Sequence, residues 1–114
     1  NVTIGALTTI HQFCQMGDYS FAGMNASITM DVPSYIKVAS NPARVVGLNS
    51  VGMERGGIDH ETITILKKAY KIIYRKGFNL KDAIEKVESI EPSNVQEVRN
   101  FIDSIKSSER GILR

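Results

Sequence analysis

The first part of the chain repeats a hydrophobic and polar pattern every six residues. Written in sixes from residue 2, it reads VTIGAL, TTIHQF, CQMGDY, SFAGMN and ASITMD. The third position is always apolar, as Ile4, Ile10, Met16, Ala22 and Ile28. The first position is always small or β-branched, and the fourth is mostly glycine. This period predicts a parallel β-helix in which each unit supplies a short strand and a turn.

We expect the third position to point into a narrow interior. Glycine after it suits a turn where a side chain would crowd its neighbours or where φ is positive. Two ordinary strands with glycine turns are the alternative, which five units in one register disfavour. Because a coil takes roughly three such units, the repeat gives fewer than two coils. The first coil would expose an apolar stack and a strand edge, so we expect upstream coils or another chain to cover them.

The register ends at DVPSY, residues 31–35, where Pro33 lacks a backbone donor. The mixed periodicity and the glycines that follow predict an extended connection along the prism, with one further strand or partial coil. We therefore divide the chain into two parts. Residues 1–57 hold the last β-helix coils (1–32) and the connecting segment, and residues 58–114 form a small all-α domain.

Three helices are predicted in that second part. Asp59 is the expected N-cap of the first, with Ile58 and Ile63 as a hydrophobic staple. Asn79 caps the second helix and Ser93 opens the third. The predicted buried stripes are Ile63, Leu66, Tyr70 and Ile73, then Ala83, Ile84 and Val87, then Val95, Val98, Phe101, Ile102 and Ile105. Core packing is their expected role.

Composition adds limits on partners and compartment. The net charge of +2 gives no argument for a nucleic-acid partner, and no apolar run reaches the length of a membrane span. The single cysteine, Cys14, excludes an internal disulfide and suits a reducing compartment. On the first predicted helix, Lys67, Lys71 and Arg75 recur at every fourth position. This basic stripe is either a solvated face or a docking surface for an acidic or phosphorylated partner.

Five motifs carry a resemblance to a known family. They are IHQFCQMGDY at 10–19, DVPSY at 31–35, SNPARVVGLNSVGMERGG at 40–57, AYKIIYRKG at 69–77 and RGILR at 110–114. With them the chain resembles the C-terminal part of the UDP-N-acetylglucosamine acyltransferases that begin lipid A biosynthesis. The resemblance implies a left-handed parallel β-helix followed by a small all-α C-terminal domain. It also implies a cytoplasmic homotrimer with active sites between neighbouring prisms.

The implied reaction moves a 3-hydroxyacyl chain from acyl carrier protein to the 3-position of UDP-N-acetylglucosamine, with no metal or organic cofactor. The family's general base is a histidine on a coil upstream of Asn1, so the resemblance implies no catalytic residue in this chain. His11 corresponds to a different histidine, which lines the active-site cleft. Gln12 corresponds to a residue that contacts the donor or the nucleotide. Asn49 and Arg55 match positions near the UDP group.

Met24 matches the position that floors the acyl-chain groove, where methionine shortens the pocket. The resemblance therefore implies a shorter hydroxyacyl chain, and filling a gap in the prism is the alternative role for Met24. Acyl carrier protein is then the expected partner of the basic stripe formed by Lys67, Lys71 and Arg75.

The chain also departs from the family pattern. Pro42 stands where many members have histidine, Val51 replaces an acidic residue, and Gly56 replaces a second arginine. These changes leave open the nucleotide contacts and whether the acceptor is a hydroxyl or an amino group.

The sequence leaves three alternative functions open. One is another hexapeptide-repeat acyltransferase, and another is a non-catalytic trimerisation fragment. The third is a β-helix carbonic anhydrase, which needs three histidines for zinc. The chain has only His11 and His60, on different predicted elements.

Overall fold

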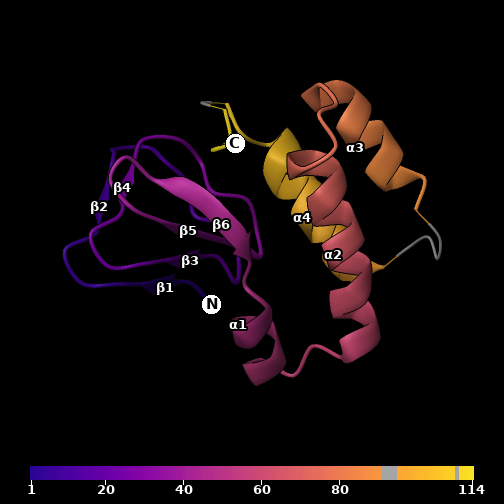
Figure 1. The fold of residues 1–114 in the computed structure, drawn as a ribbon, viewed down its shortest axis with the longest axis horizontal. Coiled ribbons are helices and arrows are strands. Elements are labelled where there is room, and N and C mark those ends of the chain that lie inside the picture. Colours follow the sequence, from indigo (N-terminus) through magenta and orange to yellow (C-terminus); the bar gives the residue numbers. More distant parts are fainter. Residues whose placement is uncertain (91–94, 110) are drawn as a thin grey trace.

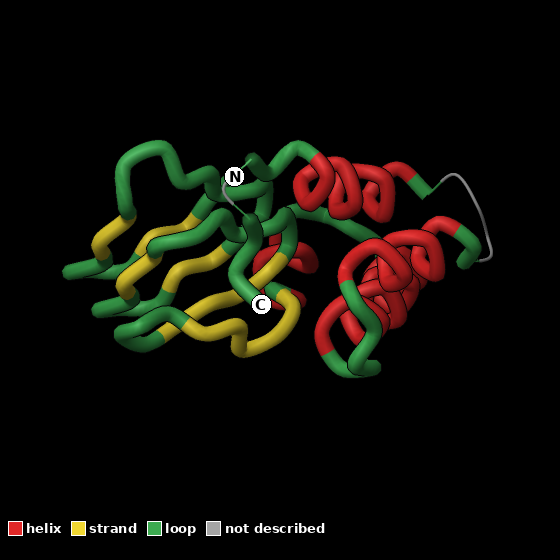
Figure 2. The backbone as a smooth tube through the Cα atoms, turned by 90° about the horizontal axis from the view of Figure 1, so that it is seen from above, coloured by secondary structure: helices red, strands yellow, loops and turns green. Residues whose placement is uncertain are grey.

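The computed structural model describes residues 1–90, 95–109 and 111–114. Short strands stack at one end of the molecule and helices pack at the other (Figures 1 and 2). The strands are β1 (Thr3–Ile4), β2 (Thr9–Ile10), β3 (Phe21–Ala22), β4 (Ser27–Ile28), β5 (Ile36–Ala39) and β6 (Arg44–Leu48). The helices are α1 (Ser50–Arg55), α2 (His60–Tyr74), α3 (Leu80–Glu88) and α4 (Gln96–Lys106).

The early strands pair in parallel at a constant offset. Thr3 of β1 lies beside Phe21 of β3, and Thr9 of β2 lies beside Ser27 of β4, so both offsets are 18 residues. This spacing is three units of six, which agrees with the stacked coils that the repeat predicts. The next step is shorter, because Phe21 pairs with Lys37 of β5 at an offset of 16 residues.

Burial follows the predicted inward positions. Ala22 and Ile28 from the third position are fully buried, and so are Ser20 and Ala26 from the first. In the first layer, by contrast, half of the Ile4 surface is exposed. This difference agrees with the uncovered first coil expected from the repeat.

The repeat uses two different devices at its turns. A positive φ occurs at the sixth position of four successive units, at Leu7, Phe13, Tyr19 and Asn25. Two glycines of the fourth position, Gly5 and Gly17, are needed for space instead. A Cβ on Gly5 would lie 2.6 Å from the backbone nitrogen of Met24, and one on Gly17 would lie 2.2 Å from that of Ser34. Crowding by the next coil therefore explains these glycines.

The segment after Pro33 differs in part from the prediction. A further strand is present, because β5 pairs in parallel with β3 and antiparallel with β6. The extended connection is wrong for residues 50–55, which form α1. Asn49 caps this helix by accepting a hydrogen bond from the Gly52 backbone nitrogen at 3.2 Å. Glycine is required there, since a Cβ on Gly52 would lie 2.3 Å from the Asn49 amide nitrogen.

The predicted caps of the next two helices are confirmed. Asp59 accepts a hydrogen bond from the Thr62 backbone nitrogen at 2.8 Å, and Asn79 accepts one from that of Asp82 at 2.9 Å. Ser93, the predicted start of the last helix, lies outside the described residues. Buried stripe positions are Ile63, Leu66, Tyr70, Ile73, Ala83, Val87, Phe101, Ile102 and Ile105, while Ile84, Val95 and Val98 are half-buried.

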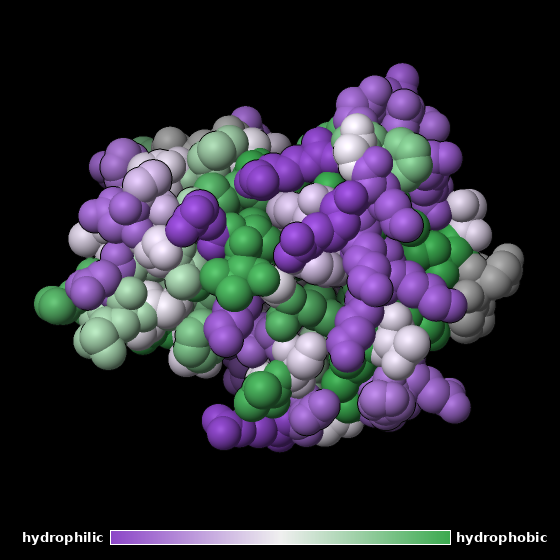
Figure 3. All heavy atoms as spheres, viewed as in Figure 1, coloured by the Kyte–Doolittle hydropathy of each residue, from purple (hydrophilic) through white to green (hydrophobic). Residues whose placement is uncertain are grey.

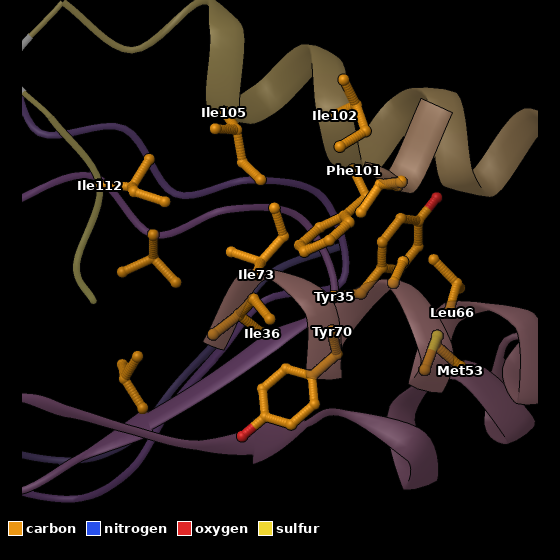
Figure 4. Packing of buried hydrophobic residues seen from close by; sticks show 14 of the residues in the cluster. Tyr35, Ile36, Met53, Leu66, Tyr70, Ile73, Phe101, Ile102, Ile105 and Ile112 are labelled. Carbon is orange, nitrogen blue, oxygen red and sulfur yellow. The ribbon is translucent and has the colours of Figure 1, made fainter. Parts of the chain in front are cut away.

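One apolar cluster joins the coils to the helices. Tyr35, at the last coil, lies beside Leu66 of α2 and Phe101 of α4, and Ile36 lies beside Ile73 of α2 (Figure 4). The C-terminal segment returns to the prism, because Ile112 forms a β-bridge with residue 31. The helices are thus fixed to the last coil through a shared core.

Candidate functional site

A cavity of about 520 Å³ lies between the strand layers and α1. Strand and turn residues of the prism supply Thr3, Tyr19, Phe21 and Lys37 to its wall, and the α1 segment supplies Asn49, Val51, Arg55 and Gly56. It therefore brings together the two positions, Asn49 and Arg55, that the resemblance places near UDP.

Asn49 ties α1 to the prism. Its amide nitrogen donates a hydrogen bond to the Tyr19 carbonyl oxygen at 2.8 Å, while its amide oxygen caps the helix. The side chain is 7% exposed. Because both ends of the amide are engaged within the chain, Asn49 shapes the wall of the cavity. The sequence reasoning missed this structural role.

Arg55 lies in the last turn of α1 with its side chain exposed at the cavity. In the part of the chain that the structure describes, no carboxylate forms an ion pair with it. A guanidinium presents a planar set of donors that suits the oxygens of a diphosphate. Arg55 thus has the chemistry and the position of an anion-binding residue.

His11 and Gln12 do not line this cavity. They follow β2 on an outer turn of the prism, and both are exposed. The backbone of His11 is fixed by the neighbouring coil, because its nitrogen donates a hydrogen bond to the Ile28 carbonyl oxygen at 2.8 Å. The coil therefore fixes the backbone position and leaves the imidazole on the surface.

Met24 also lies on an outer turn, between β3 and β4, and does not line the cavity. Its surface is 66% exposed. A side chain this exposed does not fill a gap inside the prism, so the packing role weighed for Met24 is not seen here.

The basic stripe lies along α2. Lys67 and Lys71 are exposed, and Arg75 follows the last residue of the helix as its C-cap. The Arg75 guanidinium donates a hydrogen bond to the Tyr70 hydroxyl at 3.2 Å and lies over that ring. Hydrophilic side chains cover this face of α2 (Figure 3). Among the described residues, neither Lys67 nor Lys71 makes a hydrogen bond or ring contact of this kind.

Residues 1–90, 95–109 and 111–114 contain no group of three histidine, cysteine or acidic side chains placed to hold a metal ion. None of their helices combines the length and the apolar character needed to cross a membrane.

Comparison with known proteins assigns the family. The profile described as "Udp N-acetylglucosamine O-acyltransferase; Domain 2" matches residues 31–113. The chain belongs to this acyltransferase family.

Individual relatives agree with this assignment. The acyl-[acyl-carrier-protein]–UDP-N-acetylglucosamine O-acyltransferase of Ectopseudomonas mendocina is 44% identical over 112 residues, which cover 97% of this chain and 43% of that protein. The protein of the same name from Pseudomonas aeruginosa is 42% identical over the same shares. The chain thus spans less than half the length of these curated relatives.

Solved acyltransferase structures share the fold. LpxA from Acinetobacter baumannii superposes with a TM-score of 0.93 at 41% identity, covering 99% of this chain and 44% of that one. The UDP-N-acetylglucosamine acyltransferase from Bacteroides fragilis gives a TM-score of 0.94 at 38% identity, with 100% and 44% covered.

In this acyltransferase chain the cavity wall contains residues that the sequence reasoning missed. Tyr19 and Phe21 reach it from the layer of β3, and Lys37 reaches it from β5 in the next layer. One signal was available, because Lys37 is the only lysine or arginine among the first 40 positions. Lys37 reaches the cavity because β5 pairs with β3, and the six-residue repeat did not predict that pairing.

Proposed function

We propose that the protein carrying this chain transfers a 3-hydroxyacyl group from acyl carrier protein to the 3-position of UDP-N-acetylglucosamine, the first step of lipid A biosynthesis. The observation that carries the proposal is the 44% identity to a protein of that name across 97% of this chain. The proposal includes the last coils of a left-handed β-helix (1–32) and a connecting segment, which together make up residues 1–57, followed by an all-α domain (58–114), in a cytoplasmic homotrimer. It requires no cofactor.

In this proposal the cavity beside α1 takes the nucleotide end of the acceptor. Arg55 binds the diphosphate through charge-assisted hydrogen bonds. Asn49 holds the wall, because its amide joins the Tyr19 carbonyl to the start of α1. Binding energy gathered at the nucleotide then helps to orient the sugar hydroxyl at the distant reacting centre.

His11 and Gln12 serve the cleft between neighbouring prisms. Their exposure on an outer turn supports this role, since such a turn can face a second subunit. The general base is a histidine on a preceding coil, whose near-neutral pKa suits removal of the hydroxyl proton. His11 positions substrate in this scheme.

Two further surfaces complete the proposal. Met24, exposed on the outside of the prism, floors the acyl groove and shortens it. Lys67 and Lys71 on α2, with Arg75 at its C-cap, dock acyl carrier protein, and all three side chains are exposed. Charged docking surfaces mainly accelerate association, so their loss should raise KM for the acyl donor.

The test is a transferase assay on the complete protein with 3-hydroxyacyl carrier protein and either UDP-N-acetylglucosamine or its 3-amino analogue. We expect transfer, and we expect Arg55→Gln to raise KM for the UDP-sugar on the order of tenfold, as loss of a charge-assisted contact does. Arg99→Gln, at an exposed position on α4, is the matched control and should leave KM unchanged.

The intact mass of the assayed polypeptide separates the remaining possibilities. Absence of transfer to either acceptor, together with a stable trimer, would favour a non-catalytic trimerisation module. Transfer by a polypeptide of 12.6 kDa would contradict an upstream base and assign that role to His11.

A further inference from the structure

Lys37 reaches the same cavity as Arg55 from a different element. It lies in β5 between Ile36 and Val38, which are fully buried, while Lys37 itself is exposed. Since successive side chains of a strand point to opposite faces, the lysine is directed outward from the coil. The cavity lies on that outer side, so the position of Lys37 follows from the strand.

The neighbouring strand holds the ammonium in place. Lys37 pairs with Phe21 in the parallel ladder, and its Nζ lies 5.4 Å from the centroid of the Phe21 ring. A cation over an aromatic face is attracted by the electron density of the ring. The contact is directional without neutralising the charge. Lys37 therefore remains a full cation at the cavity wall.

The charges around the cavity have one sign. Among the described lining residues, the only charged side chains are those of Lys37 and Arg55, and neither forms an ion pair with a described carboxylate. Two cations beside one cavity repel each other unless an anion lies between them. The arrangement therefore suits a ligand that carries more than one negative charge.

The helix cannot supply a second cation from the residue after Arg55. A Cβ at Gly56 would lie 2.5 Å from the Tyr19 ring, and that ring is itself stacked on Tyr35 with centroids 5.9 Å apart. A side chain at position 56 would therefore require the Tyr19 ring to move. In this chain the second positive charge comes from β5 instead.

We propose that Lys37 is the second cation of the nucleotide site and binds the diphosphate of the UDP-sugar together with Arg55. The inference rests on the proposed function, because that function supplies the diphosphate ligand. The chemistry recognised is a pyrophosphate group, whether it belongs to a nucleotide or is inorganic.

The experiment measures binding of UDP, UMP and inorganic pyrophosphate to the complete protein by titration calorimetry. Lys37→Gln should weaken UDP binding on the order of tenfold, as expected for a charge-assisted contact to phosphate. It should weaken UMP binding less. The difference from wild type should shrink in high salt, which screens exposed charges. A purely structural effect of the substitution would not follow salt in this way.

Two variants serve as controls. Lys37→Arg keeps the charge and the ring contact, so it should restore most of the affinity lost in Lys37→Gln. Lys81→Gln removes an exposed charge on α3 and should leave UDP binding unchanged. Thermal unfolding of each variant verifies that the fold is retained.

The outcomes separate the two proposals. Wild-type binding of UDP with equal affinity in Lys37→Gln overturns the role of Lys37 and leaves the proposed function intact. Failure of the wild type to bind UDP overturns the proposed function and the role of Lys37 with it. Binding of pyrophosphate that depends on Lys37, without a preference for UDP, contradicts a nucleotide site and identifies an inorganic phosphate site.

Discussion

The hydroxyl of Ser20 lies inside the coil, and its oxygen has no hydrogen-bond partner among the described residues. A buried hydroxyl without a partner lowers stability. The equivalent position of the following unit is Ala26, which is also fully buried, so the site accepts a methyl group. We expect Ser20→Ala to raise the free energy of unfolding by about 1 kcal/mol, measured by urea denaturation.

Ser20→Val is the matched comparison, because it also removes the hydroxyl but adds volume. Overfilling a close-packed interior costs roughly 1–3 kcal/mol, so this variant should be less stable than wild type. A loss of stability in Ser20→Ala would mean that the hydroxyl has a partner in solution.

Met24 provides a second prediction at a single residue. If its exposed side chain limits the acyl groove, Met24→Gly should shift the preferred donor toward longer 3-hydroxyacyl chains, because each buried methylene contributes about 0.8 kcal/mol. The measurement is kcat/KM across a series of acyl carrier protein donors. Leu7→Gly changes another exposed apolar turn residue and should leave the preference unchanged. An unaltered length preference in Met24→Gly would remove the ruler role.

Among the helices, α1 was the one that the sequence reasoning failed to predict. It spans only Ser50–Arg55 and buries a single apolar residue, Met53, so it carries no helical stripe. The cap that defines its start depends on the contact between Asn49 and Gly52. A glycine inside a segment normally indicates a turn, and here it makes room for the cap. The caps of α2 and α3 and the buried stripes of the three longer helices can be read from the sequence, whereas the N-cap of α4 is Val95, whose side chain makes no capping hydrogen bond.

The start of α2 has a pH dependence that follows from its cap. Hydrogen bonds from Thr62, from the side chain first and then from the backbone, hold the pKa of Asp59 below its usual value. The stabilisation is complete above the pKa of an unfolded aspartate, near about 4, and is lost as pH falls through the lower folded pKa. NMR titration of the Asp59 carboxyl should give this low value.

Asp59→Asn is the control for that prediction, since asparagine caps as well as aspartate but does not titrate. In this variant, the contribution of the cap to the stability of α2 should not change with pH over this range. An Asp59 pKa at or above the ordinary value would contradict the assignment.

At the scale of the whole molecule, hydrogen bonds join the prism to α4, and one of them links two side chains. The Asn100 amide of α4 donates to the Tyr35 hydroxyl at 3.2 Å. Burial raises the pKa of Tyr35, so the phenol remains protonated at neutral pH. Tyr35→Phe and Asn100→Ala should each lower the free energy of unfolding by about 1 kcal/mol.

A double-mutant cycle identifies this contact. The combined variant should lose less than the sum of the two single variants, since the two changes remove the same bond. Tyr70→Phe with Asn100→Ala should instead be additive, because the Tyr70 hydroxyl bonds to Arg75. Additive losses for Tyr35 and Asn100 would mean that the bond does not contribute to stability.

The sequence predicted the stacked parallel strands, because the third and first positions of each unit keep their chemistry through the coil. The resemblance placed Asn49 and Arg55 near the UDP group. Nothing in the sequence predicted the cavity that both residues line. Lys37 and Tyr19 reach that cavity through pairing between coils, which depends on the offset between layers rather than on local spacing. Sites assembled from stacked layers are therefore harder to derive than the layers themselves.

The 18-residue offset between β1 and β3 also limits how such a chain can change over time. Gain or loss of one whole turn keeps every inward side chain inward, so the prism can lengthen or shorten in complete turns. A single inserted residue reverses the faces of a strand and would expose its buried side chains. Homologous chains should therefore differ in length by full turns within the prism. The loops between the helices can instead gain or lose single residues.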